Sequence, residues 1–162
     1  MEEQEEGLRQ RMYSIILYNL SPIQQGIQSA HALIEYAQTR FHSPEYQRWA
    51  TTDKTLIILN GGSSVTLADH MMYLSQCGID FEVFREPDLY NGITAFCFLA
   101  DERVWDREKY PDRLPDIGYD LPGGGRIVPA IHRVFDVEAF KEQIGGEKNF
   151  LLKEFLSKFR LA

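Results

Sequence analysis

Residues 12–39 read MYSIILYNLSPIQQGIQSAHALIEYAQT, and this stretch decides which kind of fold the chain can form. Its first part, residues 12–18, is apolar and β-branched enough for a buried strand. Ser21 and Pro22 then supply a helix N-cap and a proline at the first helical position. Over residues 22–39 the apolar side chains recur at helical spacing and predict a packing stripe: Ile23, Ile27, Ala30, Ile34 and Ala37. A buried strand followed by an amphipathic helix indicates an α/β fold.

The alternation of strands and helices continues downstream. A second buried strand is predicted over residues 55–59, a helix over 64–77, and two further strands over 81–84 and 93–100. Too few residues separate the last two strands for a crossover helix, so these two should pair antiparallel. We therefore expect a single three-layer α/β domain. Its four-stranded mixed sheet would contain three parallel strands and one antiparallel return strand, flanked by helices.

The two ends of the chain differ from this middle part. Residues 1–10 begin with an acidic run and are interpreted as a flexible tail, which leaves residues 11–162 for the domain. Within it, residues 101–162 form an extended C-terminal region, rich in proline and glycine before a helical pattern over about 136–159. No apolar run is long enough to span a bilayer, and the acidic start does not resemble a secretory signal. These features predict a cytoplasmic protein without a membrane partner.

Composition narrows the function classes. The 162 residues include 24 Asp and Glu against 17 Lys and Arg, a net charge of −7. This balance argues against broad nucleic-acid binding, because neutralising phosphates requires clustered Lys and Arg, although a local basic patch stays compatible with it. Cys77 and Cys97 form no CxxC pair and are interpreted as core residues. Since His42, His70 and His132 have no ligand-like spacing either, we expect neither a metal nor a cofactor.

Topology predicts where a site should lie. Two successive β-α-β crossovers would place the C-terminal ends of the first three strands at one sheet edge, where open α/β folds bind ligands. The loops at residues 19–22, 60–64 and 85–91 would meet there, and Thr94 would join them from the start of the fourth strand.

A wholly polar stripe runs along the first helix beside the predicted packing stripe: Gln24, Gln28, His31, Glu35 and Gln38. One interpretation is a solvated flank in which His31 pairs with Glu35 one turn away. The other is that the stripe faces the cleft, where His31 moves a proton and Gln28 orients a substrate carbonyl or a water. Spacing alone leaves both interpretations open.

The loop Arg85-Glu86-Pro87-Asp88 also has two interpretations. A proline-stiffened loop directly after a strand can hold catalytic carboxylates in place, but the same residues suit a hydrophilic turn with an internal ion pair. Thr94 is either a site residue or a good strand former. Residues 123–125 are three glycines, and we interpret them as a flexible connector because they do not follow a strand as a phosphate-binding loop would.

Three features resemble the type-2 peptidyl-tRNA hydrolases, the family typical of archaea and eukaryotes. Residues 28–32, Gln-Ser-Ala-His-Ala, resemble the end of that family's alanine-rich segment, Gln-x-x-His-Ala. The order of elements over residues 12–100 is that of the family's compact mixed-sheet fold. Residues 84–88, Phe-Arg-Glu-Pro-Asp, followed by Ile93-Thr94, are similar to the family's Arg-Asp loop and the threonine that opens its last strand.

The resemblance implies hydrolysis of the ester between a peptidyl or N-acyl-aminoacyl group and the 3′ ribose of tRNA, without metal or cofactor. It implies these catalytic residues: His31, Glu86, Asp88 and Thr94. It implies these substrate-binding residues: Gln24, Gln28, Arg85 and Asn91. Arg85, with Arg103 or Arg107, would contact tRNA phosphates. The family often forms dimers, so the resemblance makes a homodimer one possible assembly.

The chain departs from the family in two places. The family's lysine should fall near Ile23-Gln24, yet no lysine occurs between Arg11 and Lys54. The Arg-Asp loop is shortened and rewritten, so the family's catalytic aspartate corresponds either to Glu86 or to Asp88. Two other functions therefore remain in view: a binding module on the same fold, with a protein or nucleotide-like partner, and a hydrolase of a different acyl or amide substrate.

Overall fold

The computed structural model describes residues 7–112, 119–120, 122–127 and 137–162, so the acidic run within residues 1–6 lies outside the described residues. The elements that build the sheet and its covering helices are β1 (Gln10–Ile16), α1 (Pro22–Arg40), β2 (Thr55–Asn60), α3 (Ser64–Gln76), β3 (Glu82–Glu86), β4 (Gly92–Asp101) and α6 (Glu147–Leu156). Shorter elements connect them: α2 (Pro44–Arg48), the π-helical turn η1 (Trp49–Asp53), the 3-10 turn η2 (Pro87–Leu89), α4 (Glu102–Trp105), β5 (Tyr119–Asp120), β6 (Arg126–Ile127) and α5 (Val137–Gln143).

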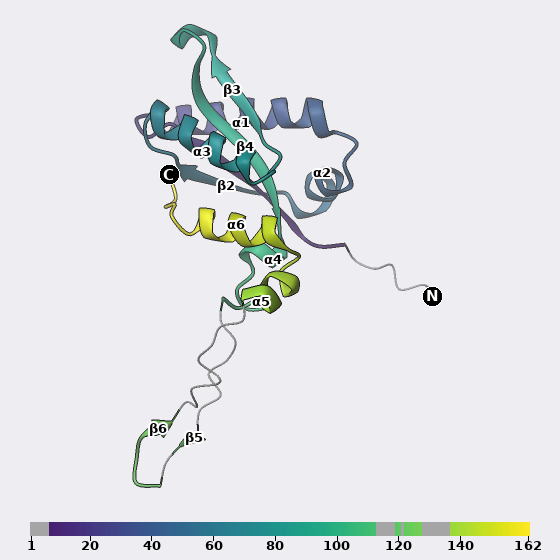
Figure 1. Ribbon diagram of the computed structural model, residues 1–162. Helices are drawn as coiled ribbons and strands as arrows, with labels where there is room; N and C mark the ends of the chain where they lie inside the picture. Colours follow the sequence, from purple (N-terminus) through teal and green to yellow (C-terminus); the bar gives the residue numbers. More distant parts are fainter. Residues whose placement is uncertain (1–6, 113–118, 121, 128–136) are drawn as a thin grey trace, which may run out of the picture.

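The four main strands form one mixed sheet in the order β2-β1-β4-β3 (Figure 1). β1 pairs parallel with β2 and antiparallel with β4, while β3 pairs antiparallel with β4. The expected set of three parallel strands is matched only in part: β1, β2 and β3 run in one direction, but β4 separates β3 from β1, so β1 and β2 are the one hydrogen-bonded parallel pair of this sheet. The physical reason lies in β4, which is apolar through almost its whole length and so takes a central position with both faces covered.

Helices cover both faces of the sheet, which gives the three layers that the sequence predicted (Figure 1). Side chains of β1 alternate between the two faces. Met12 and Ile16 pack with α1 residues such as Ala32, while Ile15 packs with α3 residues such as Leu74 and with Phe155 of α6. Because β3 and β1 both run opposite to β4, the C-terminal ends of β1, β2 and β3 still share one edge.

α1 presents the opposite face to the sheet from the one that the isoleucine spacing predicted. Ile23 is 76% exposed and Ile34 52%, whereas Gln28, Ser29, Ala32 and Tyr36 are buried. The small residues explain the choice, since the Cys97 thiol of β4 donates a hydrogen bond to the Ala32 carbonyl oxygen at 3.2 Å. A helix backbone that lies this close to the sheet leaves no room for isoleucine at the contact.

The C-terminal region returns to the sheet. The helical pattern expected over 136–159 is two helices, α5 and α6, separated at Gly145 and Gly146, which both have positive φ. After α6 the chain runs beside the outer edge of β2, where Leu161 lies opposite Leu59 in an antiparallel bridge. The Asn60 amide donates to the Arg160 carbonyl oxygen at 3.1 Å. Figure 1 accordingly places the C-terminus beside the arrowhead of β2. Within the described residues, no helix has the length and apolar character needed to cross a membrane.

Candidate functional site

A chain of side-chain hydrogen bonds joins three elements at the shared sheet edge. The Thr94 hydroxyl donates to Gln28 Oε1 at 2.5 Å, and Gln28 Nε2 donates to Glu86 Oε2 at 2.8 Å. Thr94 opens β4, Gln28 lies in the second turn of α1, and Glu86 ends β3. Thr94 is 1% exposed and Gln28 8%, so both polar groups are buried with partners.

The acceptor chemistry of Glu86 sets the direction of this chain. A carboxylate only accepts hydrogen bonds, so the NH₂ side of the Gln28 amide must face Glu86 and the amide oxygen must face Thr94. The Thr94 hydroxyl is therefore the donor. Gln28 is consequently held at both ends, with the second hydrogen of its NH₂ group left over for another acceptor.

Gln24 serves the helix instead of the site. Its Oε1 accepts from the Ser21 amide at 3.1 Å, and its own amide donates to Ser21 Oγ at 3.4 Å, which is a capping box. The side chain is exposed. The structure thus uses Gln24 to begin α1 in the right place, one turn before Gln28, and does not bring it into the hydrogen-bonded set.

His31 lies one turn beyond Gln28 and is half-buried. Its ring packs edge-on against Phe84 of β3, with centroids 4.4 Å apart, two residues before Glu86. Its Nδ1 is buried and has no hydrogen-bond partner among the described residues. Sequence reasoning missed Phe84 as the residue that fixes the His31 ring. Its position two before Glu86 in a strand was the available signal.

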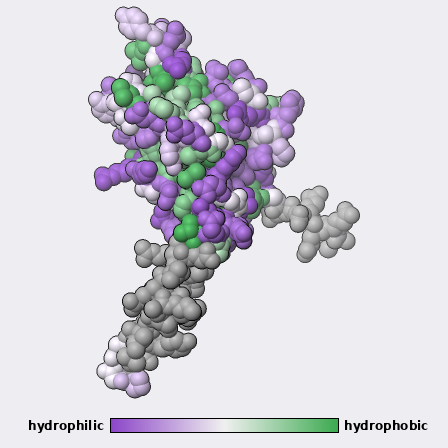
Figure 2. Space-filling model, viewed as in Figure 1, coloured by the Kyte–Doolittle hydropathy of each residue, from purple (hydrophilic) through white to green (hydrophobic). Residues whose placement is uncertain are grey.

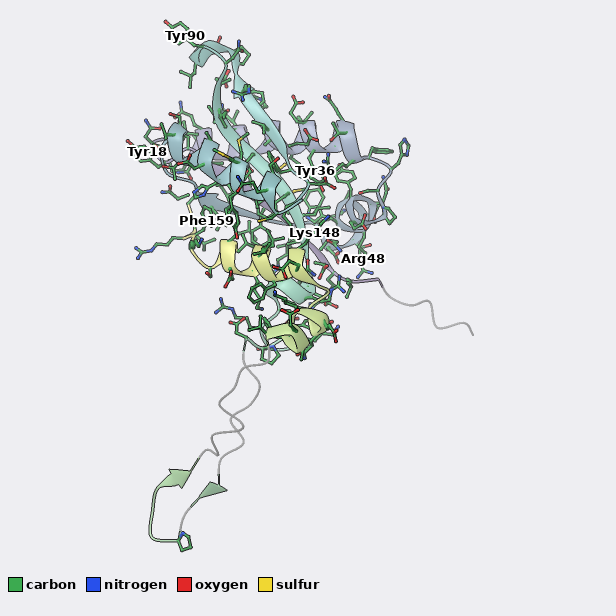
Figure 3. All side chains as sticks on the ribbon, viewed as in Figure 1. Tyr18, Tyr36, Arg48, Tyr90, Lys148 and Phe159 are labelled. Carbon is green, nitrogen blue, oxygen red and sulfur yellow. The ribbon has the colours of Figure 1, made fainter. Side chains whose placement is uncertain are left out.

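The β3–β4 hairpin separates the two carboxylates that the sequence left as alternatives. Asp88 is exposed in the η2 turn, with no hydrogen bond or ion pair among the described residues, while Glu86 reaches Gln28. Tyr90 points away from the body of the molecule at the tip of the hairpin (Figure 3), and hydrophobic surface appears on this upper part of the molecule (Figure 2).

Arg85 and Asn91 stay within the hairpin. Arg85 Nη1 donates to the Asn91 carbonyl oxygen at 3.3 Å, and both side chains are exposed. Asn91 has φ +56°, a left-handed conformation that asparagine tolerates better than most residues and that closes the turn before β4. Both residues border the site but neither bonds to Gln28.

Arg103 and Arg107, which were predicted to contact tRNA phosphates, lie at the opposite end of the sheet from Gln28. Both follow the C-terminal end of β4, which lies beside the start of β1. Arg103 is held by Asp101, with Nη2 and Oδ2 2.9 Å apart, and Arg107 pairs with Asp112 at 3.3 Å. The antiparallel direction of β4 carries these arginines away from the edge that holds Gln28.

Two other chemistries find little support near the site. Burial raises the pKa of the Cys97 thiol, and the charge of Glu82 adds to the effect, so Cys97 stays protonated and is a core residue and not a nucleophile. Across the part of the chain that the structure describes, no three His, Cys, Asp or Glu side chains gather as metal ligands would.

No protein-family model matches the chain, and no curated protein sequence matches it. The bonded residues at the sheet edge belong to the two segments, residues 28–32 and 84–94, that carry the family resemblance.

Proposed function

We propose that this protein hydrolyses the ester between a peptidyl or N-acyl-aminoacyl group and the 3′ ribose of tRNA. The observation that carries the proposal is the hydrogen-bonded set Thr94–Gln28–Glu86 beside His31. The resemblance to type-2 peptidyl-tRNA hydrolases assigns these four positions to the site, with Glu86 where the family has an aspartate. They come from three elements separated by up to 66 positions, so local sequence does not account for their meeting.

Glu86 is the residue proposed to activate water. Its Oε2 accepts from Gln28, which leaves Oε1 to accept a proton from a water molecule. The water oxygen then bonds to the ester carbonyl carbon, and the carbonyl oxygen becomes an oxyanion. The remaining N–H of Gln28 can donate to that oxyanion from a fixed position, which is where a preorganised donor contributes most.

His31 is proposed to protonate the leaving group. When the tetrahedral intermediate collapses, the bond between the carbonyl carbon and the 3′ oxygen of the ribose breaks, and that oxygen takes a proton from His31. The proton that Glu86 received returns to His31 through solvent. The products are a free N-acyl amino acid or peptide and tRNA with its 3′ hydroxyl restored. Phe84 fixes the plane of the His31 ring throughout.

The experiment is release of labelled N-acyl amino acid from charged tRNA by the purified protein, with two matched carboxylate variants. Glu86→Gln should lower kcat by about 10²-fold to 10⁴-fold, the usual contribution of a general base. Asp88→Asn should change kcat by less than about threefold, because Asp88 is exposed and unbonded. Loss of turnover in Asp88→Asn alone would move the role to Asp88.

A binding module on the same fold is the second candidate, and one observation favours it. No lysine lies between Arg11 and Lys54, where the family's activity-linked lysine belongs. A tight tRNA complex with no turnover by the parent protein would decide for this module and against the hydrolase. The homodimer that the resemblance implies stays a prediction.

A further inference from the structure

A basic cavity opens beside the end of β2, on the opposite face of the sheet from α1. Its volume is about 320 Å³, and its lining includes Gly62, Thr66, His70, Lys158 and Arg160. None of the residues that line it is acidic. The chain as a whole carries a net charge of −7. The border of this cavity, with two cations, a histidine and no carboxylate, therefore differs in charge from the chain as a whole.

The positive charges at this cavity are not neutralised by carboxylates among the described residues. Lys158 and Arg160 form no ion pair among the described residues, whereas Arg40 pairs with Glu82 and Lys109 with Glu102. The Lys158 ammonium lies 5.6 Å from the centroid of the Tyr73 ring. This cation–π contact attracts the ammonium group but leaves its positive charge in place, because the ring is neutral. The two cations can therefore act on an external anion.

Backbone hydrogen bonds fix the C-terminal segment that carries Arg160 against the sheet. The Asn60 amide bonds to the Arg160 carbonyl oxygen, and the Ala162 amide bonds to the Ile58 carbonyl oxygen at 3.1 Å. His70 packs against two rings, with centroid distances of 5.5 Å to Phe155 and 4.8 Å to Phe159. Figure 3 shows Phe159 on the same side of the molecule as Tyr18, which follows β1.

Backbone hydrogen bonds connect the cavity to the candidate site. Leu17 donates to the Thr94 carbonyl oxygen at 2.9 Å, and the next residue, Tyr18, donates to the Gly62 carbonyl oxygen at 2.9 Å. Thr94 is on β4 and Gly62 follows β2, with β1 between them. Since neighbouring strands lie about 4.8 Å apart, the two backbones are on the order of 10 Å apart. The cavity and Gln28 lie on opposite faces of the sheet, so an RNA 3′ end that joins them passes around the sheet edge and needs at least about three nucleotides at roughly 3.4 Å each.

We infer that this cavity, with Lys158 and Arg160 as its cations, binds a backbone phosphate near the 3′ end of the tRNA whose ester reaches Gln28 and Glu86. The inference rests on the proposed hydrolase function for the identity of the RNA. Lysine supplies a point charge and arginine a planar donor pair, and both suit phosphate oxygens. The C-terminal region thus supplies the cations that α1 lacks and that Arg103 and Arg107 cannot supply from the other end of the sheet.

The test measures binding of an RNA acceptor-stem hairpin with a single-stranded 3′ end by fluorescence anisotropy. Lys158→Gln/Arg160→Gln should weaken binding at least tenfold at low salt and lower the slope of log K against log salt by about 1 to 2. Lys148→Gln/Arg107→Gln removes the same charge from exposed cations outside the cavity and should change affinity by less than threefold. Equal weakening by both double variants, or none by the first, would overturn the inference.

Two further measurements locate the phosphate. Burial lowers the pKa of His70, and the charge of Lys158 lowers it further against the opposing charge of Asp69. An anion placed between His70, Lys158 and Arg160 should move the His70 imidazole titration, followed by NMR, to higher pH. Inorganic phosphate alone should reproduce that shift only at far higher concentration than the hairpin. An equal effect at equal concentration would indicate a site for free phosphate and contradict the RNA assignment.

Turnover separates this inference from the hydrolase proposal. If the parent hydrolyses charged tRNA and the Lys158/Arg160 variant has a raised KM with kcat unchanged, both stand. If the parent binds the hairpin through these two residues without any turnover, the cavity assignment stands and the hydrolase falls. If the parent turns over and the variant binds and reacts like the parent, the cavity assignment falls alone.

Discussion

The Thr94 hydroxyl holds one end of the Gln28 amide, and its removal should show how much that position matters. Thr94→Val keeps the shape of the side chain but leaves Gln28 Oε1 buried without a donor. We expect about 1–3 kcal/mol lower stability from the unsatisfied oxygen, and about a tenfold to hundredfold lower kcat from the misplaced amide. Thr94→Ser, which keeps the hydroxyl, is the control and should recover most of both. Urea unfolding and single-turnover ester hydrolysis measure the two effects, and equal kcat for Val and Ser would contradict this role.

Gly61 lies where the β2–α3 loop passes closest to the sheet. A Cβ there would meet Leu67 Cδ2 and Ile15 Cγ2 closer than real atoms approach, and it would lie 3.0 Å from the Ile16 carbonyl oxygen. Gly61→Ala should therefore cost about 1–3 kcal/mol of stability. Gly26→Ala is the matched control, because nothing lies within 4 Å of its Cβ position and it sits inside α1. It should raise stability by about 0.5–1 kcal/mol. The two urea midpoints should move in opposite directions.

At the scale of the element, α1 should tolerate changes on its isoleucine stripe. Ile23 and Ile34 are exposed, so Ile23→Gln and Ile34→Gln should each change stability by less than about 0.5 kcal/mol. Ala32 lies against β4, and Ala32→Leu should cost about 1–3 kcal/mol through overpacking. Denaturant unfolding compares the three. A larger loss for the isoleucine variants than for Ala32→Leu would mean that the helix packs with its other face.

The same helix shows where sequence reasoning stops. Ser21 and Pro22 are local signals, and they place the start of α1 correctly. Helical spacing is satisfied both by the isoleucine stripe and by the face that packs on the sheet, which holds Gln28, Ser29, Ala32 and Tyr36. The choice between them depends on β4, which lies far away in sequence. Two interactions determine which face of α1 packs on the sheet. The small Ala32 side chain allows the helix to lie close to β4, and Gln28 forms hydrogen bonds with residues of β3 and β4.

The site was predictable in part for the same reason. Residue chemistry and family resemblance named Gln28, His31, Glu86 and Thr94, but only their relative positions show that Glu86 bonds to Gln28 while Asp88 is exposed. The sheet order was not predictable from element order, because the place of β4 beside β1 follows from burial of a long apolar strand.

At the scale of the whole molecule, an ion-pair cluster ties the start of the chain to the segment after β4. Glu102 is buried and bonds to Arg9 and Lys109. Burial alone would raise the pKa of this carboxyl, but the hydrogen bonds and charges of Lys109 and Arg9 outweigh it, and the pKa is lowered from its ordinary value of 4.5. The stabilisation is therefore complete above about pH 4.5 and is lost as the pH falls through the folded-state value.

Acid unfolding should reveal this cluster. Between pH 5 and pH 3 the parent should lose more unfolding free energy than Glu102→Gln, because the variant has no carboxylate to protonate at that position. At pH 7 the variant should be the less stable of the two, since it leaves Arg9 and Lys109 without their shared partner. Urea titrations of both proteins at pH 7 and pH 3.5 provide the comparison. An equal loss in both would mean that Glu102 does not contribute to acid sensitivity.

The pairing of β1 with β4 has a kinetic consequence. Ile16 lies opposite Ala95, which is 79 positions later in the chain. A ribosome adding about 5–20 residues per second needs on the order of 4–16 s to reach Ala95 after making Ile16. For that interval the nascent β1 is an apolar strand with an open hydrogen-bonding edge, the kind of segment that aggregates or recruits chaperones. Expression yield should therefore respond to chaperone supply during synthesis more than to the equilibrium stability of the finished fold.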